Sequence, residues 1–513
     1  MKRNGLDQVF AASGVRLSRV FSLSAACRLA GLSALLFAAG CGNQYRPVLT
    51  GTNPVGPAGQ PIKYAVVLAN TGSATAGLLT FVDFSGDTVI STPSVQVNAT
   101  YLALNSTGGI GYTVNPLGTL DTFGTSNPAG LRTVDVSQTT LPANATDPNQ
   151  TNQVINPIAL GGSSGASLFI PEPPINSALG RVAALNSNGG LVQEVTLPGT
   201  PVWTVGVDNT PRVYAISTTG TSTPGVASAV ESSTGSGLNV SAAITVGTDP
   251  DFGVMDAGAR RAYILNRGSQ NITVLNVVNN TVDTGFTPSY PTLPSSSCPA
   301  TPVQPAGTIA LPNIYALVGG QCVQTASAAN PVWADFNPAT NVLAVLSAGN
   351  GTLPGVLSLI NIPLCNSATL PSNPACSTTN PVDAVGFGTV LSQAPVGVNA
   401  VQVSVLRDPL YPRAYVANGG SATVNGSVSI VDLNSGVTTG TLPTTPDTAS
   451  YANSAVFGLH PNSIAATVGD PTGKVYVTAQ DSQYVTVIQT DTEKVRTHMA
   501  IFGTGKRVVM TAP

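Results

Sequence analysis

Few residues in this chain are of the types that catalyse reactions or bind metal ions. Among its 513 residues there are two histidines, His460 and His498. Two histidines cannot form a three-histidine metal site or a multi-histidine copper cluster, and neither lies beside a nucleophile motif such as G-x-S-x-G. We therefore expect both to be structural. The sequence predicts no catalytic residue, no metal ligand, no cofactor-binding residue and no cofactor.

The six cysteines indicate anchoring and cross-linking. Cys27 and Cys41 lie in the N-terminal region, and the other four lie far downstream. Disulfides persist in exported proteins, whereas a zinc site would need C-x-x-C spacing or a nearby histidine, which these four lack. Four cysteines allow three pairings. Their clustering favours the pairs Cys298–Cys322 and Cys365–Cys376.

Acidic residues follow apolar runs at equivalent points of a repeated pattern. They are Asp83, Glu231 and Asp432, with Asn276 in the same place. A ring of metal ligands is one interpretation. The other, which we favour, is that these side chains accept hydrogen bonds from the turn after a strand. No Asp-x-Asp-x-Asp-Gly calcium loop is present, and the Gly-rich segment 161–165 precedes no helix pattern that would bind phosphate.

The repeated pattern consists of short apolar runs separated by polar turns. Residues 475–478 are followed by a turn and by a second β-branched run at 484–488, which is typical of a β-hairpin. Similar phrases begin at residues 413 and 261. Eight residues mark the copies, at spacings of 45 to 80 residues: Tyr64, Tyr112, Phe169, Tyr214, Tyr263, Leu343, Tyr415 and Tyr476.

Repeats of this size predict an all-β fold, a β-propeller of eight, or alternatively seven, four-stranded blades. Stacked blades bury both faces of each sheet, which explains uninterrupted apolar runs such as residues 64–68. The 53 glycines and 40 prolines suit many turns and disfavour long helices. A β-sandwich, or a string of sandwiches, is the alternative.

The two ends of the repeated region complement each other. The first repeat begins at its second strand, at Tyr64, while residues 506–511 form one more strand with no hairpin partner after it. We expect this C-terminal strand to complete the first blade, which would leave no free sheet edge.

Two tryptophans, Trp203 and Trp333, each follow a Pro-Val dipeptide. This shared context places both at the entry of an inner strand. Packing between blades is the favoured role, and a ligand platform beside the central channel is the alternative.

These phrases resemble the YVTN-type β-propeller repeat of bacterial surface-layer-like and envelope proteins. Residues 476–479 (Tyr-Val-Thr-Ala) and 415–418 (Tyr-Val-Ala-Asn) each depart from Tyr-Val-Thr-Asn at one position, and residues 428–432 match the family's next strand. The resemblance covers residues 60–513 and is weakest at 115–165. It implies the fold but little about function, because propellers host unrelated activities.

The N-terminal region is typical of an export signal. Basic residues precede an apolar run at 29–39 and then Cys41, which is the order of a secretion signal, and the run is too short for a membrane-spanning helix. Residues 38–41 (Ala-Ala-Gly-Cys) resemble the bacterial lipoprotein box, although that family prefers leucine at Ala38. The resemblance implies cleavage before Cys41 and a lipid such as palmitate on its sulfur. An ordinary cleaved signal with an incidental cysteine is the alternative.

The net charge of the chain and its N-terminal export signal together predict where the protein is located. Loss of residues 1–40 removes 5 of the 20 basic and 1 of the 23 acidic residues and leaves a net charge of −7. A negative chain disfavours nucleic-acid binding. We expect an exported protein held in the cell envelope by lipid on Cys41. By the same resemblance, the glycine after Cys41 implies the outer membrane, with the propeller facing the periplasm or the surface.

The sequence therefore predicts three parts. They are a lipoprotein signal peptide at 1–40, a flexible linker at 41–61, and a single β-propeller domain at 62–513. Pro- and Ser-rich insertions at 286–330 and 364–395 interrupt the domain and hold its four cysteines.

Two functions of different class remain open. The favoured one is a non-catalytic, membrane-anchored binding or scaffold module for a protein or glycan partner. The alternative is a propeller enzyme, lactonase-like or quinoprotein-like, acting as a hydrolase, lyase or dehydrogenase at the central channel. A purely structural surface component is a third possibility. A channel lined by acidic or arginine side chains would favour the enzyme, and one lined by Ser, Thr and apolar groups would favour binding.

Replacement of the proposed lipid-bearing cysteine tests the anchor. We expect Cys41→Ser to abolish incorporation of labelled palmitate and to move the chain from the membrane to the soluble envelope fraction, because an unlipidated linker has no hydrophobic anchor. Palmitate labelling and fractionation measure this. Unchanged labelling of the variant would contradict the lipoprotein assignment.

Overall fold

A computed structural model describes the chain at residues 63–72, 74–115, 118–125, 136–140 (backbone only), 154–162, 164–174, 179–233, 237–258, 260–364, 386–447, 454–469 and 472–512. Gln60–Pro513 form one compact unit. The described residues form strands and contain no helix. Accordingly, no helix among them is suited to crossing a membrane.

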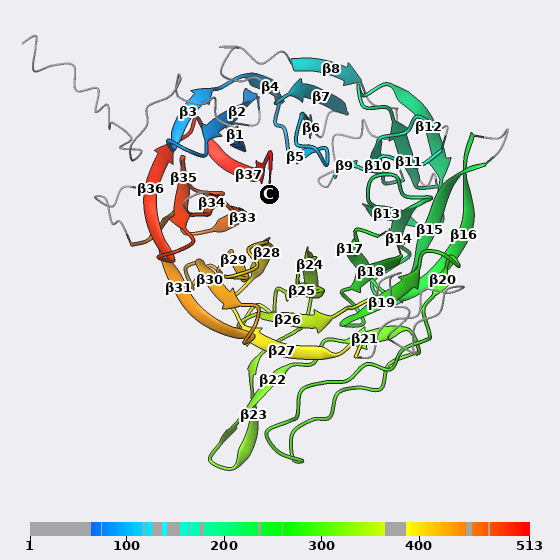
Figure 1. Cartoon of the computed structure of the whole chain (residues 1–513), viewed down its shortest axis with the longest axis vertical. Helices are drawn as coiled ribbons and strands as arrows, with labels where there is room; N and C mark the ends of the chain where they lie inside the picture. The colour runs from blue at the N-terminus through cyan, green and yellow to red at the C-terminus, as the bar shows by residue number, and fades with distance from the viewer. Residues whose placement is uncertain are drawn as a thin grey trace, which may run out of the picture. The chain divides into compact units, whose positions relative to one another are not determined.

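Eight sheets, or blades, stand side by side in a ring, with one strand of each blade nearest the centre (Figure 1). The four strands of each blade pair antiparallel, as expected where short turns join them, and the additional strand β32 (Val456–Phe457) pairs in parallel with β31 (Val437–Thr445). The fold is therefore an eight-bladed β-propeller. The blade count decides between the two numbers that the sequence left open.

The strands of blades 1 to 4 run from the innermost to the outermost in a fixed order. Blade 1 is β37 (Thr504–Met510), β1 (Tyr64–Asn70), β2 (Ala76–Asp83) and β3 (Thr88–Ser91), with β4 (Ser94–Val97) also on β2; blade 2 is β5 (Tyr101–Leu104), β6 (Ile110–Val114), β7 (Thr119–Gly124) and β8 (Val136–Thr140); blade 3 is β9 (Asn156–Pro157), β10 (Leu168–Glu172), β11 (Arg181–Leu185) and β12 (Leu191–Thr196); blade 4 is β13 (Thr200–Val205), β14 (Val213–Thr218), β15 (Pro224–Ser233) and β16 (Gly237–Thr248).

Blades 5 to 8 follow the same order. Blade 5 is β17 (Pro250–Met255), β18 (Arg261–Asn266), β19 (Asn271–Asn276) and β20 (Thr281–Val282), with β21 (Thr308–Ala310) also on β19; blade 6 is β24 (Pro331–Asn337), β25 (Val342–Ser347), β26 (Val356–Asn361) and β27 (Val390–Pro395); blade 7 is β28 (Ala400–Leu406), β29 (Arg413–Asn418), β30 (Ser427–Asp432) and β31 (Val437–Thr445), with β32 (Val456–Phe457) beyond; blade 8 is β33 (Pro461–Thr467), β34 (Lys474–Ala479), β35 (Tyr484–Gln489) and β36 (Lys494–Ala500).

The eight sequence markers all fall on the second strand of a blade, from Tyr64 on β1 to Tyr476 on β34. Second strands are sandwiched between neighbouring strands and between neighbouring blades, so they are buried on both faces. Phe169, Tyr214 and Tyr415 are fully buried. Burial of the phenol also raises the pKa of Tyr214 to about 12. The repeated apolar residues in the sequence therefore mark the second strand of each blade, because that strand must be apolar on both faces to pack.

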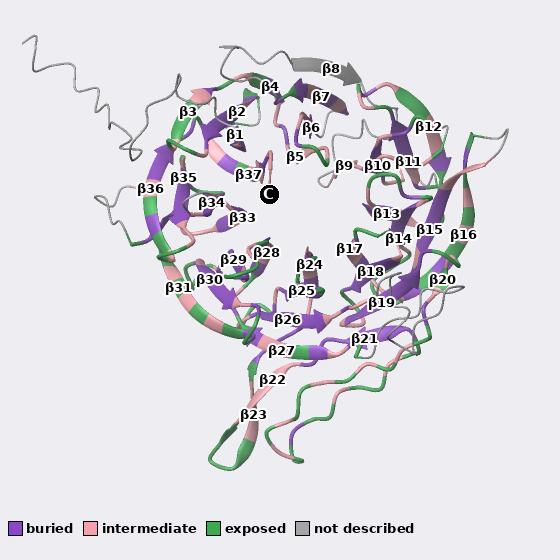
Figure 2. Ribbon diagram, in the orientation of Figure 1, coloured by how far each residue is buried: buried purple, intermediate pink, exposed green. Residues whose placement is uncertain are grey.

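The hydrophobic core is divided into eight clusters, one for each contact between neighbouring blades. The second and third strands supply most of their members, whereas outer strands are more exposed: β31 alternates between exposed and partly buried residues (Figure 2). Each blade therefore buries its apolar faces only because its two neighbours cover them.

Side chains also bridge neighbouring inner strands. Asn156 donates to the Thr204 carbonyl at 2.8 Å, and the Trp203 indole donates to the Gly253 carbonyl at 3.0 Å. Ser463 donates to Gln402 at 2.9 Å. These bonds satisfy polar groups beside the channel and tie one blade to the next.

The C-terminal strand closes the ring as the sequence predicts. β37 pairs with β1 in antiparallel register, with Val508 opposite Val67. Val508 is buried in the cluster between blades 8 and 1, and its amide donates to Ser463 of blade 8 at 3.1 Å. The first blade thus takes its innermost strand from the other end of the chain (Figure 1).

The segment between β20 and β24 is partly built into the ring. β21 returns to pair with β19, while β22 (Ile314–Val318) and β23 (Gln321–Ala326) form a separate hairpin that projects outward (Figure 1). A disulfide joins Cys298 to Cys322 on this hairpin. Cys365 and Cys376 lie outside the described residues, as do Cys27 and Cys41.

The second predicted insertion, 364–395, is shorter in the structure. Its last residues form β27, the outer strand of blade 6. The sequence placed β27 in the insertion because a partly exposed outer strand lacks the continuous apolar run that marks the second strands.

A charge placed on the closing strand should disrupt the whole ring. We expect Val508→Asp to lower the free energy of unfolding by roughly 3 kcal/mol or more, because an unpaired carboxylate would enter an apolar interface. The midpoint of denaturant-induced unfolding measures this.

The same substitution at an exposed position provides the control. Val323→Asp on β23, where the side chain is 42 % exposed, should change stability by less than about 0.5 kcal/mol. Equal effects of the two substitutions would argue against closure by β37.

Candidate functional site

A repeated β-bulge sets which side chains reach the middle of the ring. Inner strands β13, β17, β24, β28, β33 and β37 each pair with the second strand through a register shift at the same point. A bulge re-aims the side chains next to it. The residues that follow the bulge are Trp203, Phe252, Trp333, Gln402, Ser463 and Arg507.

Aromatic rings from four blades meet there. The ring centroids of Trp203 and Phe252 lie 4.5 Å apart, those of Phe252 and Trp333 4.6 Å, and those of Trp203 and Trp333 5.8 Å. Tyr101 of β5 contacts Trp203 at 6.4 Å. We name these four residues the aromatic cluster. Both tryptophans were expected to pack between blades; they do contact that core, but they also contact each other in the channel.

Arg507 joins the aromatic cluster from blade 1. Its guanidinium carbon lies 4.1 Å from the centroid of Tyr101 and 5.1 Å from that of Trp333. Such cation–π contacts are attractive because the ring face is electron-rich. Burial raises the pKa of the Tyr101 hydroxyl, and the nearby Arg507 acts in the opposite direction.

A hollow of about 750 Å³ lies against the aromatic cluster, on the face where loops join first strands to second strands. We name it the channel hollow. Its walls come from the inner strands β5, β9, β13, β17, β24 and β37, with Trp203, Phe252, Val254, Phe336 and Val509 as apolar residues and Asp208, Asp335, Arg407 and Arg507 as charged ones.

Two carboxylates of the channel hollow are held by protein groups. Asp335 accepts from the amides of Val405 and Phe336, both at 2.8 Å, and lies 3.8 Å from Arg407. Burial raises the pKa of Asp335, and Arg407 opposes that rise. Asp208 accepts from the Ala159 amide at 3.1 Å.

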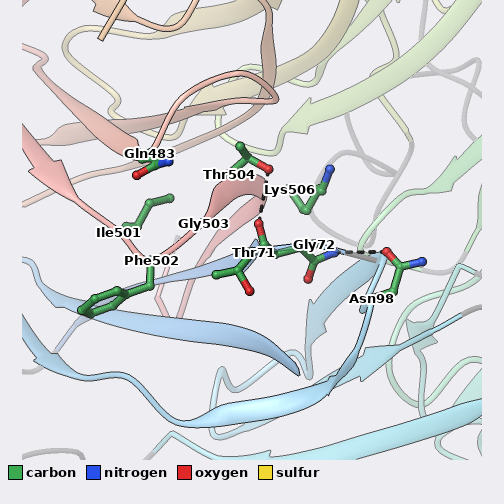
Figure 3. A pocket seen from close by; sticks show the side chains of 10 residues that line it. Thr71, Gly72, Asn98, Gln483, Ile501, Phe502, Gly503, Thr504 and Lys506 are labelled. Carbon is green, nitrogen blue, oxygen red and sulfur yellow. Dashed lines mark hydrogen bonds between the residues drawn. The ribbon is translucent and has the colours of Figure 1, made fainter. Parts of the chain in front are cut away.

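A second hollow of about 590 Å³ opens on the opposite loops, where blades 8, 1 and 2 meet (Figure 3). We name it the seam hollow. Phe502, Thr504 and Lys506 come from the segment that leads into and forms β37, and Thr71, Asn98 and Gln483 line the same hollow. It is thus a direct product of ring closure.

The polar groups of the seam hollow are pre-positioned by the chain. The Asn70 amide donates to the Ala99 carbonyl at 2.9 Å, and the Thr504 hydroxyl bonds to the Asn70 carbonyl at 3.4 Å. Phe502 stands beside them with 64 % of its surface exposed. An exposed ring next to fixed hydrogen-bonding groups can stack on one ligand face while the groups bind its edges.

The histidines lie outside both hollows. His498 stacks on Phe457 with centroids 3.6 Å apart and donates from Nε2 to the Ala455 carbonyl at 2.9 Å; burial lowers its pKa. His460 donates from Nδ1 to the Gly419 carbonyl at 2.8 Å. Both have the packing contacts of structural histidines.

The recurring acidic positions hold turns, as the sequence predicts. Asp83 accepts from the amides of Ser85 and Gly86, both at 3.0 Å, and Asp432 accepts from two following amides at 2.8 and 2.9 Å. Asn276 does the same, whereas Glu231 pairs with Arg212 at 3.4 Å. Among the described residues no group of three His, Cys, Asp or Glu side chains is placed to hold a metal ion.

A buried carboxyl group in blade 3 was not predicted. Glu172 ends β10 with no exposed surface, and its charged neighbours are Glu194 and Arg181. Burial and the neighbouring Glu194 raise its pKa to about 8, while Arg181 acts against the rise. Burial and the neighbouring Glu194 thus favour the protonated form of Glu172.

Sequence reasoning also missed Arg507 and Phe502. If the repeats are aligned on the bulge, Arg507 falls in register with Trp203 and Trp333. Such an alignment of the sequence would have indicated that Arg507 lies beside the tryptophans. Phe502 gives no such signal, because its neighbours come from blades 1, 2 and 8.

Comparisons with known proteins support the fold alone. No protein-family model matches the chain, and no curated protein matches it. Among solved structures, dihydro-heme d1 dehydrogenase NirN in complex with DHE is similar at a TM-score of 0.50 and 10 % identity, over 89 % of this chain and 76 % of that one. AztD from Citrobacter koseri has a TM-score of 0.47 and 12 % identity, over 87 % and 97 %. Sqt1 from Saccharomyces cerevisiae has a TM-score of 0.46 and 10 % identity, over 80 % and 87 %.

Glu172 should make stability depend on pH. Its pKa is raised to about 8 in the folded chain, above the value of an exposed glutamate, so its contribution is fully present at low pH and is lost as pH rises through about 8. We expect the unfolding midpoint to fall between about pH 5 and pH 9, and Glu172→Gln to flatten this fall and to stabilise the chain above about pH 8.

Thermal unfolding across this pH range measures the effect. Glu231→Gln, which removes a carboxylate on the next blade, is the control and should leave the fall in place. An unaltered pH dependence in Glu172→Gln would show that Glu172 is already ionised in the folded chain.

Proposed function

We propose that this chain is a membrane-anchored binding module of the cell envelope, with a glycan partner seated in the seam hollow. The lipid anchor on Cys41, the export signal and membership of the YVTN-type propellers are parts of this proposal. They are supported by the sequence features of residues 1–41 and by the repeated phrases on the second strands.

The observation that carries the glycan proposal is the exposed ring of Phe502 beside the fixed polar groups of the seam hollow. A large exposed aromatic side chain is costly to leave in water, and such positions often mark contact sites. Phe502 is 64 % exposed in a loop held by ring closure rather than in a free terminus.

The chemistry of the seam hollow suits a sugar. A pyranose presents a face of C–H groups that packs on an aromatic ring and an edge of hydroxyl groups that need donors and acceptors. Asn98 and Gln483 supply both, Thr71 supplies a hydroxyl, and Lys506 supplies a cation for an acidic sugar.

A different surface favours a protein partner. The projecting β22–β23 hairpin exposes Leu317, Val318 and Val323 at 48 %, 59 % and 42 %, and its strands pair only with each other among the described residues. A two-stranded hairpin with apolar side chains and open edges can add to a partner's sheet.

The enzyme alternative gains less support from the structure. The channel does carry acidic and arginine side chains, as that alternative requires, but Asp335 and Asp208 are held by backbone amides. Neither histidine lines the channel hollow.

Removal of the exposed ring should weaken glycan binding. On an array of peptidoglycan fragments, lipopolysaccharide core oligosaccharides and capsular fragments, we expect wild-type protein to bind at least one class, and Phe502→Ala to reduce that affinity about tenfold. Titration calorimetry with the bound oligosaccharide measures the change.

Tyr411 offers a matched control, since it is also 64 % exposed but lies outside both hollows. Tyr411→Ala should bind as wild type does. If wild-type protein binds no oligosaccharide, or if both variants lose affinity equally, the glycan proposal fails.

A further inference from the structure

We propose that the channel hollow is a second ligand site, and that it binds a small anionic compound with an apolar or aromatic body, held by Arg507. The site lies on the opposite face from the seam hollow and goes beyond the glycan function. The proposal rests on an unpaired cation, on occupied carboxylates beside it and on apolar walls of suitable size.

Arg507 lacks the partner that most embedded cations of this chain have. No carboxylate among the described residues pairs with it, and its Nε is buried without a hydrogen-bond acceptor. A guanidinium carries five N–H donors that need acceptors. By contrast, the basic residues that open the second strands of blades 5, 7 and 8 are paired: Arg261 with Asp283, Arg413 with Asp432 and Lys474 with Asp87. Arg181, which opens the third strand of blade 3, pairs with Glu194.

Aromatic stacking explains only part of this arrangement. The rings of Tyr101 and Trp333 attract the cation through their faces, but the in-plane N–H groups still need oxygen acceptors. A carboxylate, sulfonate or phosphate group matches the planar fork of a guanidinium with two parallel hydrogen bonds. The Tyr101 hydroxyl is a hydrogen-bond partner of Arg507, but no carboxylate of the described residues pairs with it, so the geometry leaves room for an anion.

The acidic residues of the channel hollow do not fill this role. Asp335 is held by two backbone amides and faces Arg407. Asp208 is held at the rim by Ser106 and the Ala159 amide. Their negative charges are thus engaged by other donors, and Arg507 remains the charged group of the hollow without an opposite charge.

The walls define the rest of the ligand. Trp203 contributes a partly buried ring and Phe252 a buried one, and Val254, Phe336 and Val509 complete an apolar surface in a hollow of about 750 Å³. This volume lies within the range of small-molecule sites, which pair apolar walls with a few polar anchors. A ring or short aliphatic body on these walls would bring its acidic group to Arg507.

The two tryptophans make the site directly observable. The chain has only two, and both Trp203 and Trp333 belong to the aromatic cluster. Tryptophan emission therefore reports on this site alone, without a label.

The test compares an anion with its uncharged isostere. We expect phenylacetate to change tryptophan emission of the full-length protein with an affinity about tenfold higher than phenylacetamide, and phenylphosphonate to separate a phosphate preference from a carboxylate preference. Arg507→Gln should remove the preference for either anion over the amide. Arg507→Lys should keep part of it, because the charge remains and the planar fork is lost.

Lys494→Gln, which removes a cation from the exposed outer strand β36, is the matched control and should keep the full preference. Unfolding midpoints establish that each variant is folded. Equal affinity of wild-type protein for the anions and the amide, absence of any emission change at millimolar ligand, or an undiminished preference in Arg507→Gln would each overturn the proposal. If Arg507→Gln does not fold, full preference in Arg507→Lys overturns the bidentate contact, and partial loss supports it.

Discussion

The pairing of β37 with β1 is the constraint on which the rest of this ring depends. Each blade is a four-stranded sheet with two apolar faces, and neither face is covered within the blade itself. The faces are covered only when every blade has a neighbour on both sides, so an open array would leave two of them in water. Pairing the last strand with the first blade removes both free faces and also a free sheet edge. The closing contacts are direct: Val508 is buried between blades 8 and 1, and Lys474 of blade 8 pairs with Asp87 of blade 1 at 2.7 Å.

Closure also determines where the two hollows form. Inner strands brought together around one axis leave a channel, and the bulge in six of them aims equivalent side chains into it. Large rings at three equivalent positions, Trp203, Phe252 and Trp333, fill the middle of the channel. The channel hollow therefore ends at an aromatic floor, and the seam hollow on the other face is built from the closing segment itself. One packing solution thus produces two chemically different sites.

The few charged residues of the chain have mainly structural roles. Charged residues make up 8 % of the sequence, and many of the embedded ones perform structural tasks. Arg413, at the start of a second strand, pairs with Asp432 on the third strand at 2.5 Å, and strand-end carboxylates hold turns. Such pairs are neutral overall and leave little field at the surface. Arg507 departs from this pattern, since its surroundings are aromatic rings rather than a carboxylate.

The architecture could be predicted from the sequence, because burial on both faces restricts each second strand to a recognisable run of apolar residues. The eight markers from Tyr64 to Tyr476 all lie on those strands, and the unpaired run at the C-terminus became the closing strand. Outer strands were less clear, and β27 was taken for part of an insertion because only two of its six residues are buried. The sites were decided by tertiary structure alone. Phe502, Asn98 and Gln483 are far apart in the chain and meet only at the seam. Arg507 and Trp333 meet only because eight sheets share one axis. Contacts of this kind depend on how blades are placed around the ring, and no local periodicity encodes that placement.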